Sequence, residues 1–283
     1  MKRRDLLKTL GVAAGSALMG KELAAQEKPG QGAEADPWGI LIDTTKCQGC
    51  GMCEWGCAEK NGLPEPDSSV DRTVPRETSP SQVTVVNSYE TQKGTVNVKR
   101  QCMHCMQPAC ASACLTKALE KGPDGAVTWD ADKCMGCRYC MVSCPFDMPK
   151  FEYDTPTPQL RKCELCHDRQ AQGEVPACVA NCPFGALQAG RRSELLVEAR
   201  RRIALNPDDY VHHIYGEQEA GGTSVLYLSS VPFDQIGFRT DLSQAAYPTF
   251  TKEFLYAVPM VLTLVPPFLL GLSRATRGRE EEE

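Results

Sequence analysis

Four cysteines lie within eleven residues of the segment CMGCRYCMVSCPF, which spans residues 134–146. They are Cys134, Cys137, Cys140 and Cys144, and a proline follows the last one. Three thiolates at intervals of three residues can wrap a short loop around one corner of a [4Fe–4S] cube, and a fourth cysteine before a proline commonly ligates a second cluster. Zinc sites more often use two separated C-x2-C pairs, and disulfide geometry is hard to satisfy in so short a run. The spacing therefore favours iron–sulfur clusters over zinc or disulfides.

The same arrangement of thiols recurs three times elsewhere in the chain. One run repeats the spacing unchanged, and two related runs are C-x2-C-x4-C-x3-C and C-x2-C-x11-C-x3-C. The four runs use all sixteen cysteines, which is the number that four [4Fe–4S] clusters require at four thiolates each. The candidate cofactor-binding residues, all expected as iron ligands, are Cys47, Cys50, Cys53, Cys57, Cys102, Cys105, Cys110, Cys114, Cys134, Cys137, Cys140, Cys144, Cys163, Cys166, Cys178 and Cys182.

Other kinds of site are less compatible with these residues. His104 and His167 lie beside cysteines, but a Rieske-type centre needs histidine in place of cysteine, so we expect both to be structural. A catalytic iron–sulfur enzyme commonly leaves one iron open and uses three cysteines, whereas every run here has four, so no catalytic residue is expected. The chain has neither a G-x-G-x-x-G motif after a strand nor a Walker A motif. Its net charge of −5 argues against nucleic acid as a partner.

The N-terminal segment MKRRDLLKTLGVAAGSALMGKELAAQ has the order of a twin-arginine export signal. Arg3 and Arg4 precede an apolar stretch over residues 10–20 and small residues near Ala25. The twin-arginine route carries folded proteins, so clusters can be inserted before the chain meets an oxidising periplasm. We therefore predict a signal over residues 1–26 and a protein on the periplasmic side of the bacterial inner membrane.

An uncharged stretch of twenty residues, Phe254 to Ser273, lies close to the C-terminus. That length suffices for a helix to cross a bilayer, and a helix packed against neighbours tolerates its three prolines. The charged tail that follows, residues 274–283, contains three arginines. By the positive-inside rule this tail stays cytoplasmic. We predict a transmembrane anchor over residues 254–273; the alternative is a buried helix of the globular part.

Internal repeats indicate how the runs are organised. TTKCQGCGMCEWGC (residues 44–57) is similar to DADKCMGCRYCMVSC (130–144), and PACASACLTKAL (108–119) is similar to PACVANCPFGAL (176–187). We expect an α+β fold over residues 38–190, with duplicated ferredoxin-like dicluster domains, short strands and helices, in addition to the C-terminal transmembrane helix. Such a region has little room for a hydrocarbon core, so metal binding would supply much of its folding free energy.

Several local elements can be predicted around the cysteine runs. Residues 58–101 form an insertion that ends in a hairpin of SQVTVVNSY and GTVNVK; whether it covers a cluster or meets a partner is open at this point. The AVTW strand at 126–129 precedes a cysteine loop, and the PAC-x3-C segments are expected to begin short helices.

The C-terminal extension, residues 191–250, has its own predicted elements. A strand is expected over residues 225–228. Ser193 is a candidate cap of a helix that runs to Leu205. The basic residues 200–202 on that helix are expected to face solvent.

Four segments of the chain resemble the four-cluster ferredoxin subunits of membrane-bound periplasmic oxidoreductases, and the HybA type above all. They are QCMHC (101–105), GCRYCMVSCP (136–145), KCELC (162–166) and YGEQEAGGTSVLYLSSVP (215–232). The resemblance covers nearly the whole chain. It implies a non-catalytic subunit with four [4Fe–4S] clusters, which relays electrons between the small and large subunits of a [NiFe] hydrogenase and an integral membrane subunit that reacts with quinone.

The resemblance also implies a nested sharing of ligands between the runs. It joins Cys47, Cys50 and Cys53 with Cys182; Cys163, Cys166 and Cys178 with Cys57; Cys102, Cys105 and Cys110 with Cys144; and Cys134, Cys137 and Cys140 with Cys114. Spacing alone also permits a tandem sharing, in which the first run pairs with the second and the third with the fourth. Ala58 and Leu115 stand where proline commonly follows the last cysteine, which leaves the ligands intact.

Two alternative functions remain open from the sequence. The chain also resembles the β subunit of a periplasmic formate dehydrogenase, or of another molybdenum or tungsten oxidoreductase, which would keep the relay and change the electron donor. A zinc-binding scaffold would differ from both in being colourless.

Overall fold

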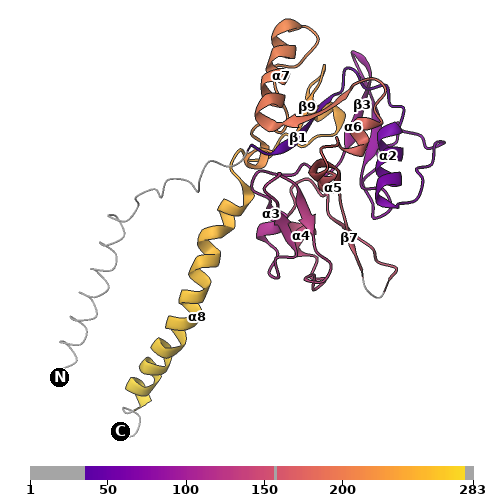
Figure 1. Ribbon diagram of the computed structural model, residues 1–283. Helices are drawn as coiled ribbons and strands as arrows, with labels where there is room; N and C mark the ends of the chain where they lie inside the picture. The colour runs from indigo at the N-terminus through magenta and orange to yellow at the C-terminus, as the bar shows by residue number, and fades with distance from the viewer. Residues whose placement is uncertain (1–35, 156–157, 278–283) are drawn as a thin grey trace. The chain divides into compact units, whose positions relative to one another are not determined.

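A computed structural model of the chain describes residues 36–155 and 158–277. The predicted twin-arginine signal lies outside these residues, and so do the last six residues of the predicted tail. A three-stranded sheet has β1 (Trp38–Asp43) at its centre, antiparallel to β8 (Leu187–Arg191) and parallel to β9 (Val225–Leu228) (Figure 1). The strand predicted over residues 225–228 is confirmed.

Both faces of this sheet are covered, which explains why β1 is almost continuously apolar. On one face Leu41 and Leu226 pack against Leu195 of the helix α7 (Arg192–Leu205). On the other face, Ile40 belongs to the core cluster that also contains several cysteines. The sheet therefore supports the cysteine loops on the face opposite α7.

The start of α7 differs from the prediction. Ser193 lies inside the helix and does not cap it. Instead, the carboxylate of Asp36 accepts a hydrogen bond from the backbone nitrogen of Ser193 at 3.0 Å and another from its hydroxyl. A carboxylate brought from another part of the chain thus satisfies one of the free N–H groups at the start of the helix.

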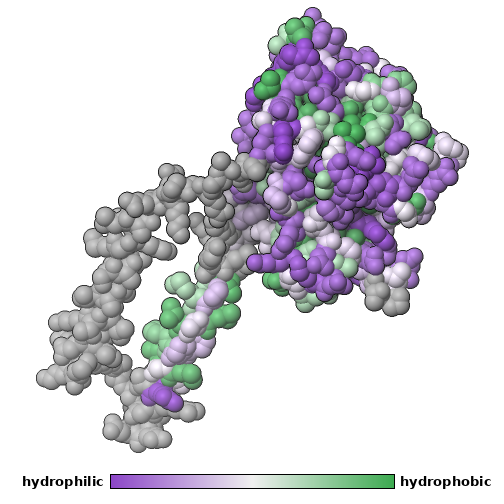
Figure 2. All heavy atoms as spheres, viewed as in Figure 1, coloured by the Kyte–Doolittle hydropathy of each residue, from purple (hydrophilic) through white to green (hydrophobic). Residues whose placement is uncertain are grey.

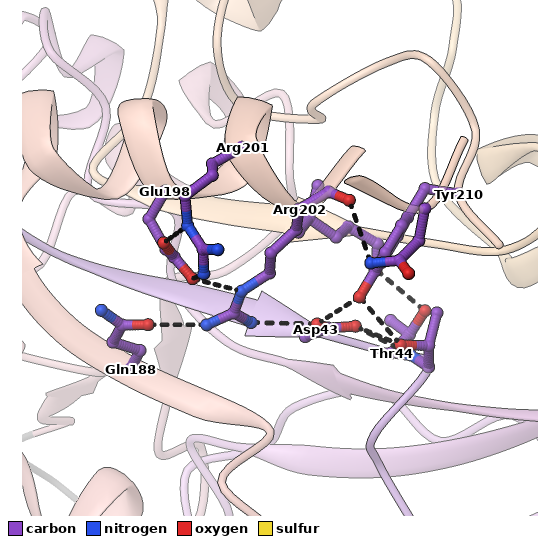
Figure 3. Close-up of polar contacts among 10 residues, drawn as sticks. Asp43, Thr44, Gln188, Glu198, Arg201, Arg202 and Tyr210 are labelled. Carbon is purple, nitrogen blue, oxygen red and sulfur yellow. Dashed lines mark hydrogen bonds and ion pairs between the residues drawn. The ribbon is translucent and has the colours of Figure 1, made fainter. Parts of the chain in front are cut away.

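A buried ion pair ties α7 to the end of β1 (Figure 3). Asp43 is fully buried, and its carboxylate receives hydrogen bonds from Arg202 at 2.9 Å, from Tyr210 at 2.9 Å and from Thr45 at 2.6 Å. Arg202 is only 13% exposed in its side chain, so the expectation that the whole basic run faces solvent is wrong at its last residue. The network fixes the backbone immediately before the first cysteine run.

The predicted hairpin is formed by β2 (Val85–Thr91) and β3 (Gly94–Arg100), paired antiparallel. It contacts α2 (Met52–Asn61), the helix within the first cysteine run, through Val86 of β2. The buried carboxylate of Glu54 on α2 accepts hydrogen bonds from the backbone nitrogen of Val86 and from Arg76, both in the insertion. The insertion therefore contacts the first cysteine run and covers part of it, with Cys50 left exposed.

The remaining elements of the described chain are short. They are α3 (Ala109–Ser112), β4 (Leu119–Lys121) paired with β5 (Val127–Trp129), α4 (Tyr139–Ser143), β6 (Lys150–Phe151) paired with β7 (Leu160–Arg161), α5 (His167–Ala171), α6 (Ala177–Ala180), and the 3-10 turns η1 (Glu219–Gly221) and η2 (Phe233–Ile236). The short helices expected at the PAC-x3-C segments are confirmed as α3 and α6, and the AVTW strand is confirmed as β5. Figure 1 shows α3 and α4 side by side, where they carry parts of two cysteine runs.

The C-terminal helix α8 extends over Tyr247–Arg277 and contains three prolines. Within the described residues, its part Ala257–Arg274 is long and apolar enough to cross a membrane, and no other described helix meets that criterion. Its large side chains are exposed, Met260 and Leu270 each to 63%, and Figure 2 shows hydrophobic side chains along the helix. The alternative of a buried core helix is therefore wrong.

Candidate metal centres

The loops that carry the cysteines are curled by residues with left-handed backbone. In the first run Gly49 has φ 68° and in the matching run Gly136 has φ 69°. The residue before the following helix is also left-handed in both runs, Gly51 at φ 79° and Arg138 at φ 60°. The two loops thus share a backbone conformation as well as a spacing, which supports the internal repeat. Duplication of whole ferredoxin-like domains stays a prediction.

All sixteen cysteines are free thiols. Many of these thiols interact electrostatically with one another. These interactions gather the sixteen into four sets of four, which we name groups A to D. Group A is Cys47, Cys50, Cys53 and Cys182; group B is Cys57, Cys163, Cys166 and Cys178; group C is Cys102, Cys105, Cys110 and Cys144; group D is Cys114, Cys134, Cys137 and Cys140.

Each group draws three thiols from one run and the fourth from another. The membership of the groups is that of the nested sharing. The tandem sharing would instead have brought Cys182 to Cys134, whereas Cys182 interacts with Cys47.

The four groups are neighbours in the order A, B, C, D. Cys53 of group A interacts with Cys178 of group B. Cys163 of group B interacts with Cys102 of group C. Cys110 of group C interacts with Cys140 of group D.

Exposure to solvent differs between the ends and the middle of this row. Cys50 in group A and Cys137 in group D are the exposed thiols, whereas every thiol of groups B and C is buried or half-buried. The ends of the row are therefore open to other molecules and its centre is shielded from water.

Burial makes bare thiolates unfavourable at most of these positions. Loss of hydration raises the pKa of Cys57 and of Cys110 to about 12, and that of Cys140 and of Cys144 to about 11. A bound metal deprotonates a coordinating thiol outright and supplies the missing positive charge. The donor set thus fits a metal cofactor that uses thiolate ligands.

The thiols of group D line a common cavity. Among the described residues, no three histidine, cysteine, aspartate or glutamate side chains are arranged to hold one metal ion. All four thiols of group D nevertheless line one cavity, together with the apolar side chains of Leu119 and Phe151. Four thiols around one cavity fit a [4Fe–4S] cube, in which each cysteine binds a different iron.

Hydrogen-bond donors surround several sulfurs. The backbone nitrogen of Ala118 donates to Cys114 Sγ at 3.2 Å, that of Leu165 to Cys163 Sγ at 3.4 Å, and Asn61 Nδ2 to Cys57 Sγ at 3.5 Å. At Cys114 burial opposes ionisation, but hydrogen bonds from the backbone and from a neighbouring hydroxyl outweigh it and lower the pKa. Such donors are one means by which a protein sets the potential of a cluster.

Buried cations near the thiols were not predicted from the sequence. Lys99 and Lys162 are almost fully buried, and Lys162 Nζ donates to the backbone carbonyl of Cys163 at 2.9 Å. Lys121 Nζ donates to the carbonyl of Cys105 at 2.9 Å. A lysine one residue before a cysteine or on a hairpin carries no sequence signal of burial, because lysine is usually exposed.

The two histidines beside the cysteines have different environments: His167 is half-buried at the start of α5, whereas His104 lies in the interior. His104 is fully buried, and its Nδ1 accepts a hydrogen bond from the backbone nitrogen of Val127 at 3.0 Å. Burial, aided by the nearby Lys162 and Lys121, lowers the pKa of His104 well below its usual value. His104 is therefore a neutral structural residue, as expected.

Comparison with known proteins agrees with these features. A family model described as a 4Fe-4S dicluster domain matches residues 95–192. A protein of Nitratidesulfovibrio vulgaris is 44% identical over 99% of this chain and 78% of its own length. The Hydrogenase-2 operon protein HybA of Escherichia coli O157:H7 is 37% identical over 87% of this chain and 85% of its own length. The iron-sulfur subunit of the nitrate-inducible formate dehydrogenase of Escherichia coli K12 is 36% identical over 66% of each chain.

Proposed function

The chain belongs to the HybA-type family of iron–sulfur subunits, and we propose that its sixteen cysteines hold four [4Fe–4S] clusters and that it relays electrons within a membrane-bound oxidoreductase. When bound, such clusters accept and give up one electron at a time. The chain supplies the thiolates, keeps them apart from water and sets their electrostatic surroundings. It performs no bond-making chemistry in this proposal.

The observation that carries the proposal is the row of four thiol groups. Each group has four sulfurs, and each is the neighbour of the next. A row with exposed thiols at its ends has a place for entry and a place for exit of electrons. A storage or scaffold protein has no need of such an order.

The surroundings of group D support an assignment of that end to the membrane side. Exposed apolar side chains lie in its runs, among them Leu115 and Val142, each 82% exposed. A pocket lined by Tyr139 and Val142 is also lined by Tyr247 and Pro248 at the start of α8. Cys144 of group C lines the same pocket. The end of the row that groups C and D form is therefore the end next to the start of the candidate membrane helix.

The proposal includes a location and an orientation. The arginine pair near the N-terminus suggests twin-arginine export, α8 provides a possible anchor, and the arginines after it suggest a cytoplasmic C-terminus. We place the cysteine region on the periplasmic side of the inner membrane. Electrons would pass between a [NiFe] hydrogenase, through its small and large subunits, and an integral membrane subunit that reacts with quinone.

A formate dehydrogenase or another molybdenum or tungsten enzyme is the second candidate for the electron donor. The similarity to formate dehydrogenase iron-sulfur subunits favours it, although that similarity covers 66% of the chain whereas the one to HybA covers 87%. The relay itself is the same in both cases.

The proposal is tested by purifying the tagged protein from detergent-solubilised membranes and measuring its metals. We expect nickel to co-purify, and hydrogen to drive quinone reduction by the complex. Molybdenum or tungsten in place of nickel would show that the electron donor is the second candidate, a molybdenum or tungsten enzyme. Zinc without iron would contradict the relay altogether.

A ligand variant connects the activity to this chain. Cys137→Ala removes a thiol of group D and should abolish hydrogen-dependent quinone reduction, or prevent export of the protein. Val197→Ala is the control, because this exposed side chain on α7 is remote from the cysteine runs. Quinone reduction at the wild-type rate in the Cys137→Ala complex would contradict the proposal.

A further inference from the structure

Lys99 is a cation in the interior of the protein. It lies on β3 and is 1% exposed. Its Nζ donates a hydrogen bond to Gln101 Oε1, and its backbone carbonyl accepts one from the hydroxyl of Tyr227 at 2.8 Å. The backbone of Lys99 and the tip of its side chain are thus both held in place.

The strand β3 directs this side chain toward the first cysteine run. Residues two apart on a strand share a face, so Asn97 and Lys99 of β3 point the same way. Asn97 Nδ2 donates to the backbone carbonyl of Cys47 at 3.0 Å. The face that carries Lys99 is therefore the face that contacts group A.

The negative partners of Lys99 are thiols. Within residues 36–155 and 158–277, no aspartate or glutamate forms an ion pair with it. Its strongest electrostatic interactions are with Cys178 and Cys163 of group B and with Cys53 of group A. Burial alone disfavours the charged ammonium, but these interactions outweigh it and raise the pKa of Lys99.

A buried ammonium without a carboxylate is costly unless another anion compensates it. The sulfurs of groups A and B are the available anions once they are thiolates. Net charge is one of the quantities that set the reduction potential of a cluster. Adding an electron increases the negative charge, so a fixed cation nearby favours the reduced form.

We infer that Lys99 is the shared counter-charge of groups A and B, and that it raises the reduction potentials of the two clusters held there. The inference rests on the proposed function, because it requires clusters at both groups. One electron enters a cluster for each electron that leaves its donor, and Lys99 keeps its proton throughout. The clusters of groups C and D, which lie farther along the row, depend on Lys99 less.

The test is a redox titration of the purified full-length complex, followed by electron paramagnetic resonance, with Lys99→Met. We expect two of the clusters to become harder to reduce, by at least tenfold in the equilibrium constant, or about 59 mV for a one-electron couple. Lys99→Arg should keep both potentials close to the wild type. Lys93→Met is the control, since this lysine lies at the exposed tip of the same hairpin.

A second variant keeps the test decisive if Lys99→Met does not assemble. Gln101→Glu has nearly the same shape and places a negative charge beside the ammonium, so it should lower the same two potentials. Unchanged potentials in Gln101→Glu, or in an iron-replete Lys99→Met protein, would overturn the inference. Absence of clusters from the wild type would instead refute the proposed function, which separates the two failures.

Discussion

At the scale of residues, the position of a thiol matters as much as its presence. Spacing identified the sixteen cysteines as candidate ligands, but spacing alone could not say which of them share a group. That information depends on contacts between residues far apart in the chain, such as Cys47 and Cys182. The buried Lys99 could not be predicted either, since an alternating strand gives no sign that its polar face is also covered.

The membership of the groups gives a prediction that single substitutions can test. Cys47→Ser and Cys182→Ser should alter the same electron paramagnetic resonance signal, because both thiols belong to group A. Cys134→Ser should alter a different signal, that of group D. A shared signal for Cys182→Ser and Cys134→Ser is what the tandem sharing predicts, and it would contradict the grouping.

At the scale of elements, two loops have the same backbone conformation but different neighbouring residues. The loops CQGCGMC and CMGCRYC have matching left-handed glycines. A Cβ at Gly49 would come within 2.5 Å of Asn97 Oδ1, whereas a Cβ at Gly136 would meet nothing within 4 Å. The sequence repeat predicts the common backbone of the two loops. It does not predict that the hairpin packs on the first loop and not on the second.

This difference makes Gly49→Ala and Gly136→Ala a matched pair. Both variants carry the strain of a left-handed alanine, on the order of 1 kcal/mol. Gly49→Ala must also displace Asn97, whose hydrogen bond to Cys47 is worth roughly 1 kcal/mol more. We expect a lower thermal midpoint for Gly49→Ala, measured as loss of the visible absorbance. Equal midpoints would show that the hairpin does not constrain the first loop.

The helix α7 shows which contacts the sequence does not predict. The sequence predicted the helix α7, yet the carboxylate at its start came from Asp36 and the one in its buried ion pair from Asp43, both remote in sequence. Local patterns specify an element and its inner face. They do not specify which distant carboxylate satisfies its polar groups.

At the scale of the whole molecule, strands that are far apart in the sequence pair with one another and bring the cysteine runs together. The central strand β1 pairs with β8 and β9, which come about one hundred and fifty residues or more later. Short strands and repeats in the sequence predicted the mixed α+β class, but a parallel pairing over such a separation has no local signal. The pairing brings the first and last runs together, as groups A and B require.

We propose that this single chain holds four clusters in one row. The most direct measurement is the iron and acid-labile sulfide content per chain of anaerobically purified protein, with Mössbauer spectra to identify the cluster type. We expect about sixteen irons and about sixteen sulfides per chain, all in [4Fe–4S] form. About eight irons, or zinc in their place, would mean that the thiol groups described here do not all hold clusters.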